Sequence, residues 1–163
     1  MQRNDTSFFG CNRPPNREPE ISIALLHPVF GKFKDDSKRA TPTAEDYRCV
    51  RGLRECMLQF FDDEGIRRSK LLDILDDYGI GAQPGPIGST SRTTDGHIVS
   101  NIHPRLIIEV KNDIGWKGAE PSLQALAYYD SFCRERKLWD DISSCHPCFI
   151  VCVAGKSHYY FCS

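Results

Sequence analysis

The sequence predicts an α/β domain, and three observations support this fold class. Two strand-like segments, 92–99 and 106–111, are separated by a short turn. Three other segments carry apolar residues at helical spacing, and 148–154 is a continuous apolar run. Strand and helix patterns that alternate along a chain are typical of α/β proteins. At 163 residues the chain suits one domain that is large enough to bury a core.

Residues 1–42 are expected to form an N-terminal extension that is partly irregular, followed by the domain proper over 43–163. The first 20 residues are rich in Asn, Arg and Pro. The segment Ile21–Leu26 is predicted to be a short strand or an apolar tether that ends at His27-Pro28. The charged segment Gly31–Pro42 is predicted to be a loop.

Two helices are predicted next. Thr43 is a suitable N-cap, and the acids that follow it favour a helix that runs to about Asp62. A second helix is expected from about Ile66 to Tyr78, ending at a glycine. The Pro- and Gly-rich segment 83–91 is predicted to be a loop that grades into an edge strand.

The strand at 106–111 is an apolar run that contains an acid and a base two residues apart. Because side chains alternate along a strand, two faces are expected. One face carries Leu106, Ile108 and Val110, and the other carries Ile107, Glu109 and Lys111. If the preceding strand pairs with this one, Asp95 can converge with Glu109 and Lys111. Two carboxylates on adjacent strands suit Mg²⁺, which keeps its other positions for water and phosphate.

A third helix is predicted at about Glu120–Lys137, where Gln124 and Tyr128 share one face because they are four residues apart. The apolar run 148–154 is typical of a central strand covered on both faces. A turn and a returning strand at 159–161 complete the pattern. Since the chain ends directly after this strand, we expect one module of a longer protein or a truncated copy.

These residues resemble a known family signature. Asp95 followed by Glu109-Val110-Lys111 resembles the Asp…(Asp/Glu)-x-Lys signature of the PD-(D/E)XK nuclease superfamily. Gln124 and Tyr128 resemble the Gln-x-x-x-Tyr element of RecB-type members. From about residue 93 to 161, the layout is similar to domains of fungal and oomycete Crinkler-type proteins, and of fungal proteins that also carry a kinase-like domain. One departure is Thr94, which stands where the family has a proline.

The resemblance implies a restriction-endonuclease-like fold with a mixed central sheet flanked by helices. It further implies a nuclease that hydrolyses phosphodiester bonds with Mg²⁺ or Mn²⁺. Asp95 and Glu109 would then ligate the metal together with the Val110 carbonyl, and Lys111 would orient or activate water.

The resemblance also assigns Gln124 and Tyr128 to substrate positioning. In this fold the first helix often supplies an extra acid to the metal. Asp46 lies within the apolar face of the first predicted helix and Glu55 lies roughly opposite that face, and the sequence does not decide between them.

The expected partner is nucleic acid, with DNA preferred over RNA. A net charge of −1 is unusual for such a protein, although basic clusters exist. Charge clusters are also typical of solvated surfaces. These clusters are Lys32-Lys34-Lys38-Arg39, Arg48-Arg51-Arg54, Arg67-Arg68-Lys70 and Arg134-Arg136-Lys137.

Two alternatives to a nuclease remain open. The first is a catalytically inactive nuclease-fold module that binds or regulates within a larger effector or kinase-like protein. The second is a small host-targeting interaction protein in which the acids serve only in surface ion pairs. Separation of Asp95 from Glu109 in the structure would favour the second alternative.

The chain is expected to act inside the cell, in the cytoplasm or the nucleus, without a membrane partner. Its start is polar and lacks a signal-peptide pattern, and no apolar run approaches the roughly 18 residues of a membrane span. The eight cysteines are scattered and suit buried positions in a reducing compartment. Cys145-x-x-Cys148 could bind zinc with Cys152 and His158, but a second matching pair is missing from the sequence, which disfavours zinc.

Overall fold

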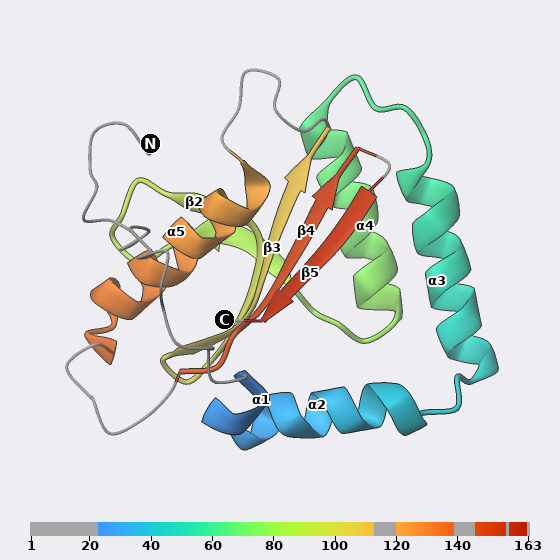
Figure 1. Cartoon of the computed structure of the whole chain (residues 1–163). Coiled ribbons are helices and arrows are strands. Elements are labelled where there is room, and N and C mark those ends of the chain that lie inside the picture. The colour runs from blue at the N-terminus through green and yellow to red at the C-terminus, as the bar shows by residue number, and fades with distance from the viewer. Residues whose placement is uncertain (1–22, 113–119, 139–145, 156, 163) are drawn as a thin grey trace, which may run out of the picture.

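The computed structural model describes residues 23–112, 120–138, 146–155 and 157–162, which form a mixed α/β structure (Figure 1). Its five strands lie in sequence order across one sheet. The strands are β1 (Gln83–Pro86), β2 (Thr93–Ser100), β3 (His103–Lys111), β4 (Phe149–Ala154) and β5 (Ser157–Cys162). Neighbouring strands are antiparallel except for β3 and β4, so the sheet is mixed.

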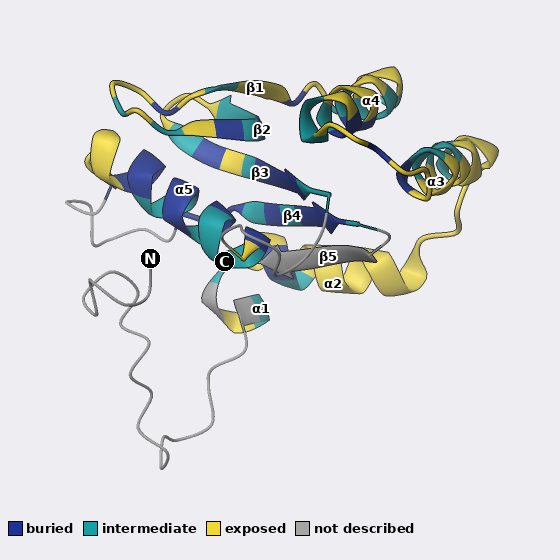
Figure 2. Cartoon of the chain, turned by 90° about the horizontal axis from the view of Figure 1, so that it is seen from above, coloured by how far each residue is buried: buried dark blue, intermediate teal, exposed yellow. Residues whose placement is uncertain are grey.

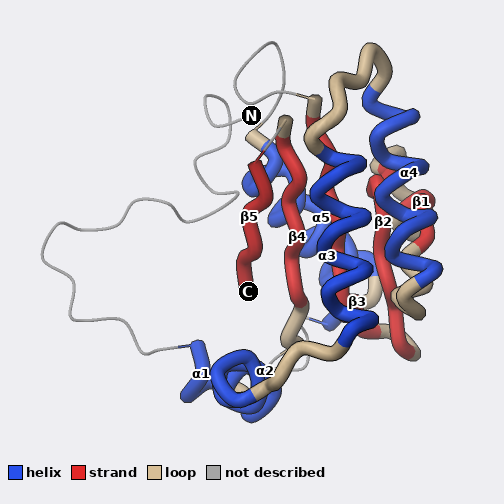
Figure 3. The backbone as a smooth tube through the Cα atoms, turned by 90° about the vertical axis from the view of Figure 1, so that its right-hand side faces the viewer, coloured by secondary structure: helices blue, strands red, loops and turns tan. Residues whose placement is uncertain are grey.

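The parallel pair β3–β4 organises the layers of the molecule. Its register runs from Leu106 opposite Phe149 to Lys111 opposite Ala154. Parallel neighbours need a crossover, and helix α5 (Pro121–Glu135) provides it. This helix covers one face of the sheet, whereas α3 (Ala44–Met57) and α4 (Glu64–Asp77) lie on the other (Figure 3).

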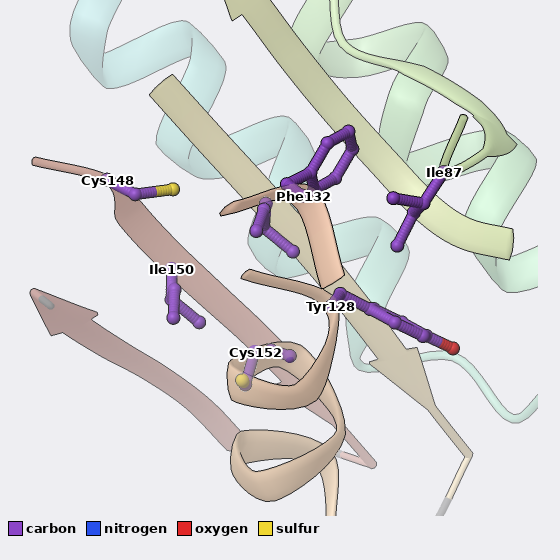
Figure 4. Packing of buried hydrophobic residues seen from close by; sticks show 8 residues of the cluster. Ile87, Tyr128, Phe132, Cys148, Ile150 and Cys152 are labelled. Carbon is purple, nitrogen blue, oxygen red and sulfur yellow. The ribbon is translucent and has the colours of Figure 1, made fainter. Parts of the chain in front are cut away.

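The two faces of β3 pack into separate clusters, as the alternation of its side chains predicts. The cluster against α5 comprises Ile87, Ile107, Ala125, Tyr128, Phe132, Cys148, Ile150 and Cys152 (Figure 4). The cluster against α3 and α4 comprises Met57, Leu71, Ala82, Ile108, Val110 and Val153. Strands β3 and β4 are therefore buried on both faces (Figure 2).

The predicted helices are present, with shifted ends. Thr43 caps α3 by accepting a hydrogen bond from the Asp46 backbone N–H, so the predicted start is confirmed. Helix α3 ends at Met57, earlier than expected, and α4 begins at Glu64, two residues before the expected start. The N-cap of α4 is Asp63, whose side chain accepts a hydrogen bond from the Ile66 backbone N–H. The earlier start of α4 places an additional acid in its first turn.

Two predictions for the segment 23–42 were wrong, whereas the irregular lead expected over the first 20 residues lies outside the described residues. Residues Ile23–Leu26 form the short helix α1 rather than a strand, and Pro28–Arg39 form helix α2 where a charged loop was expected. The His27 side chain caps α2, and Pro28 stands at its first position, which suits a helix start. The ring of Phe30 packs on Phe149 with centroids 5.6 Å apart, so tertiary contact stabilises this charged helix.

The strand predictions at 92–99, 106–111, 148–154 and 159–161 are confirmed by β2, β3, β4 and β5. The predicted edge strand is the short β1. In the described part of the chain, the helices are too short or too polar to cross a membrane.

Candidate active site

Glu109 is the central residue of the candidate site, because β3 carries its carboxylate into the interior. The side chain is fully buried. Lys111 Nζ lies 3.0 Å from Glu109 Oε1, at ion-pair distance. Within the described residues, however, neither carboxylate oxygen has a hydrogen-bond partner. Buried carboxylates are normally fully paired, so this one is an exception.

The surroundings of Glu109 strongly disfavour its charged form. Burial is the largest cause and raises the pKa of Glu109 to about 8, and the nearby charge of Asp95 also raises it. The ammonium of Lys111 opposes these effects without cancelling them. The carboxylate therefore lies in a position where additional positive charge would stabilise it.

Asp95 lies beside this carboxylate. It precedes Gly96, which pairs with Ile108, so β2 brings it alongside the end of β3. Its Oδ2 accepts a hydrogen bond of 2.9 Å from the Val110 backbone N–H. Its Oδ1 lies 3.3 Å from Arg68 Nη1. The structure thus brings Asp95 and Glu109 together. It also places the Val110 backbone N–H against Asp95. The Val110 side chain packs in the cluster against α3 and α4.

Lys111 extends from the end of β3 between two acids. Its Nζ donates to Glu64 Oε1 at 2.9 Å and lies 3.0 Å from Glu109 Oε1. Burial lowers the pKa of Lys111, but the hydrogen bond to Glu64 and the charge of Glu109 outweigh burial and raise its pKa. Lys111 is therefore cationic at neutral pH.

Glu64 is the site residue that the sequence analysis missed. It is in the first turn of α4, and its Oε2 accepts from the Asn112 backbone N–H at 3.4 Å. The signal was the pair Asp63-Glu64, in which an N-capping acid precedes a second acid at a helix start. The expected second helix began at Ile66, which left this acid outside it.

The two acids of the first predicted helix that are candidates for an extra metal ligand do not lie at the site. Asp46 accepts hydrogen bonds from the hydroxyl groups of Tyr78 and Thr43, and the bond from Tyr78 is the main reason that the pKa of Asp46 falls to about 2. This carboxylate belongs to the contact between α3 and α4. Glu55 is exposed on α3.

Gln124 and Tyr128 lie together on α5. Gln124 Nε2 donates to the Tyr128 hydroxyl at 2.5 Å. The Tyr128 ring packs in the same cluster as Ile107, and Figure 4 shows its hydroxyl pointing away from Cys148 and Ile150. Burial is the main reason that the pKa of Tyr128 is raised, and the charges of Glu109 and Asp95 contribute. The Tyr128 hydroxyl is therefore close enough to the two carboxylates for their charges to raise its pKa.

The chemistry of these groups fits a small divalent cation. Among the described residues, no three His, Cys, Asp or Glu side chains form a group that could hold a metal ion. Mg²⁺ and Mn²⁺ need fewer, since one or two carboxylates with water and phosphate oxygens suffice. The carboxylate oxygens of Glu109 and Asp95 are of the type that such a cation would bind, and Glu109 Oε2 lacks a hydrogen-bond partner within the described residues.

The structure gives no support to zinc at the cysteines. Cys148 and Cys152 are buried in the α5 cluster. Burial raises the pKa of each thiol to about 12, which disfavours the thiolate that zinc requires. Cys145 lies outside the described residues, as does the His158 side chain.

We found no protein-family model, curated protein or solved structure that matches this chain. Its function is therefore inferred from the arrangement of Asp95, Glu109, Lys111 and their neighbours. That arrangement combines two adjacent carboxylates with a fixed ammonium group, and Oε2 of the buried Glu109 lacks a hydrogen-bond partner among the described residues. These groups can hold a divalent cation and place a positive charge next to it.

Proposed function

We propose that this chain is a metal-dependent nuclease of the restriction-endonuclease-like fold, and that it hydrolyses phosphodiester bonds in DNA, or alternatively in RNA. The observation that carries the proposal is the buried Glu109 carboxylate, which adjoins Asp95. Its Oε1 is in an ion pair with Lys111, and its Oε2 lacks a partner within the described residues. Burial of a carboxylate without full pairing costs several kcal/mol. A divalent cation between the two acids removes that cost, which explains why the acids are placed there.

The two acids and one backbone carbonyl form the proposed metal-binding groups. Asp95 and Glu109 hold Mg²⁺ or Mn²⁺, with the Val110 carbonyl as a further oxygen. When bound, such a cation supplies positive charge to the phosphate and lowers the pKa of water. In the cation-free protein, the Val110 N–H keeps Asp95 oriented.

Lys111 acts as an oriented positive charge in this scheme. The pKa of Lys111 is raised by its acidic neighbours, so it does not serve as the base. Its ammonium orients the attacking water and offsets the negative charge that builds up on the phosphate. Gln124 and Tyr128 position the nucleic acid from α5.

The order of features along the chain supports the fold assignment. An acid on β2 precedes Glu109-x-Lys111 on β3, the Gln124 and Tyr128 pair follows on α5, and the apolar β4 lies parallel to β3. This order is similar to that of RecB-type domains in Crinkler-type and kinase-associated proteins. We therefore propose the same kind of role, as one module of such a protein.

Digestion of plasmid DNA and of labelled single-stranded DNA and RNA, with Mg²⁺ or Mn²⁺, tests the proposal. We expect the chain to cleave at least one substrate, and chelation by EDTA to abolish cleavage. Glu109→Gln and Lys111→Ala should each lower the rate by at least about a hundredfold. Glu55→Gln, an exposed glutamate on α3, is the matched control and should retain the rate. Activity that survives Glu109→Gln contradicts the assignment.

The second candidate is a catalytically inactive module of the same fold that binds or regulates. Two observations favour it. Asp95 already accepts hydrogen bonds from Val110 and Arg68, and the net charge of the chain is only −1. Calorimetric titration with Mn²⁺ separates the candidates, because an inactive module of this kind binds no cation through Glu109.

A further inference from the structure

Helix α4 presents two charged side chains to the candidate site, one acidic and one basic. Glu64 and Arg68 are four residues apart and share one face of the helix. Glu64 binds Lys111, while Arg68 Nη1 lies 3.3 Å from Asp95 Oδ1. Each charged group on this face of α4 is therefore paired with a group that the proposed nuclease uses.

Arg68 differs sharply from its neighbour Arg67. The Arg67 guanidinium is buried and donates to the carbonyl oxygens of Gly155 and Met57 and to the Asn112 side chain. The Arg68 side chain is 35% exposed, and its hydrogen bond is to Asp95. Arg67 therefore supports the structure, whereas Arg68 is able to leave its partner.

A cation at the site and the guanidinium of Arg68 compete for the same carboxylate. Asp95 Oδ2 is held by the Val110 N–H, and Oδ1 faces Arg68. A divalent cation bound to Asp95 would repel the positive charge of Arg68 at this distance. Partly exposed ion pairs are weak, so the pair between Arg68 and Asp95 can be exchanged at little cost.

We propose that Arg68 binds a phosphate of the nucleic-acid backbone after a divalent cation has displaced it from Asp95. This inference rests on the proposed function. Guanidinium groups suit phosphate oxygens because they donate parallel hydrogen bonds and stay charged. The released side chain remains anchored on α4 beside the metal-binding acids, which is where a phosphate that contacts the cation would lie. Cation binding thereby creates part of the substrate site.

The test measures binding of a fluorescein-labelled DNA duplex by anisotropy over a range of salt concentrations, with Ca²⁺ or with EDTA. Ca²⁺ serves as an oxygen-bound cation with looser coordination than Mg²⁺, and it is used here to slow cleavage. In Ca²⁺, Arg68→Gln should weaken binding and reduce the slope of log affinity against log salt by about one. In EDTA the same substitution should have little effect on DNA binding, because Arg68 is then paired with Asp95 and does not contact the phosphate. Equal effects in both conditions, or none in either, overturn the inference.

Arg39→Gln is the charge-matched control. Arg39 is the last residue of α2, which lies at the opposite end of the sheet from the end of β3 (Figure 1). Any effect of Arg39→Gln should be the same with and without the cation, and a cation-dependent effect as large as that of Arg68→Gln contradicts the specific role.

Calorimetry with Mn²⁺ separates this inference from the proposed function. Arg68→Gln removes the competitor of the cation, so Mn²⁺ affinity should rise by up to about fivefold. Weaker Mn²⁺ binding by Arg68→Gln would show that Arg68 only supports the site. This result would contradict the inference about Arg68 but not the proposed function. A native chain that binds no Mn²⁺ would overturn the proposed function and this inference with it.

Discussion

Lys111 Nζ lies 2.9 Å from Glu64 Oε1, although the two residues are 47 positions apart in the sequence. This contact joins the start of α4 to the end of β3. It also directs the ammonium of Lys111 to a point between Glu64 and Glu109. The position of the proposed catalytic lysine therefore depends on an acid from a different layer of the fold.

Glu64→Gln tests this dependence. The amide still accepts a hydrogen bond but lacks the charge that raises the pKa of Lys111. We expect the lysine pKa to fall, which NMR of the lysine side chain can measure. Loss of a supporting partner of this kind typically lowers activity by about ten- to a hundredfold. An unchanged lysine pKa and an unchanged cleavage rate would show that Glu64 does not position Lys111. Glu55→Gln serves as the control.

The buried Glu109 predicts an unusual pH dependence of stability in the cation-free protein. The pKa of Glu109 is about 8 in the folded state, against an ordinary value of 4.5. Between these values the folded protein keeps a proton that the unfolded chain releases. The contribution of Glu109 to stability is thus lost as pH rises from about 4.5 to about 8, and it changes little above that.

Glu109→Gln removes this titration. In EDTA, the variant should be more stable than the native chain at pH 8, by roughly 2 kcal/mol or more. The two stabilities should approach each other as the pH falls. Urea unfolding at several pH values measures this difference. Curves that stay parallel between pH 5 and about 8 would contradict the burial assigned to Glu109.

Tyr128→Phe tests substrate positioning from α5. The change removes the hydroxyl that accepts from Gln124 but keeps the ring in its cluster. The loss of one hydrogen bond should change the free energy of unfolding by only about 1 kcal/mol. We expect KM for nucleic acid to rise while thermal stability stays similar. A variant with native KM would assign Tyr128 to packing alone.

Arg67→Ala should destabilise the fold. The guanidinium connects the end of α3, the β4–β5 turn and Asn112, and it lies 4.6 Å from the Phe61 ring centroid. Its removal leaves one buried and two partly buried acceptors without this donor, at a cost of about 3 kcal/mol. Thermal unfolding should show the loss, whereas Arg51→Ala, at an exposed position on α3, should change stability by less than about 0.5 kcal/mol.

The sequence predicts the central hairpin and the two faces of β3 because side-chain alternation is a local property. Leu106 and Ile108 separate from Ile107 and Glu109 in any strand, whatever packs on the sheet. The proximity of Asp95 to Glu109 follows as soon as β2 and β3 pair. These relationships need no knowledge of distant segments.

Features that depend on distant contacts could not be predicted in this way. Helix α2 is rich in charges and is stabilised by Phe30 against Phe149, a contact that no local pattern reveals. The roles of Glu64 and Arg68 depend on how α4 lies across the end of β3. Helical spacing indicates that these two residues share a face, but it does not indicate which strand that face meets.

An anomalous difference map from crystals soaked in Mn²⁺ tests the central claim most directly. The account predicts one strong peak within about 2–2.5 Å of a carboxylate oxygen of both Asp95 and Glu109. The peak should vanish in Glu109→Gln. Crystals that diffract well and show no peak between these two residues, or a peak that persists in the variant, would contradict the metal site and the nuclease function built on it.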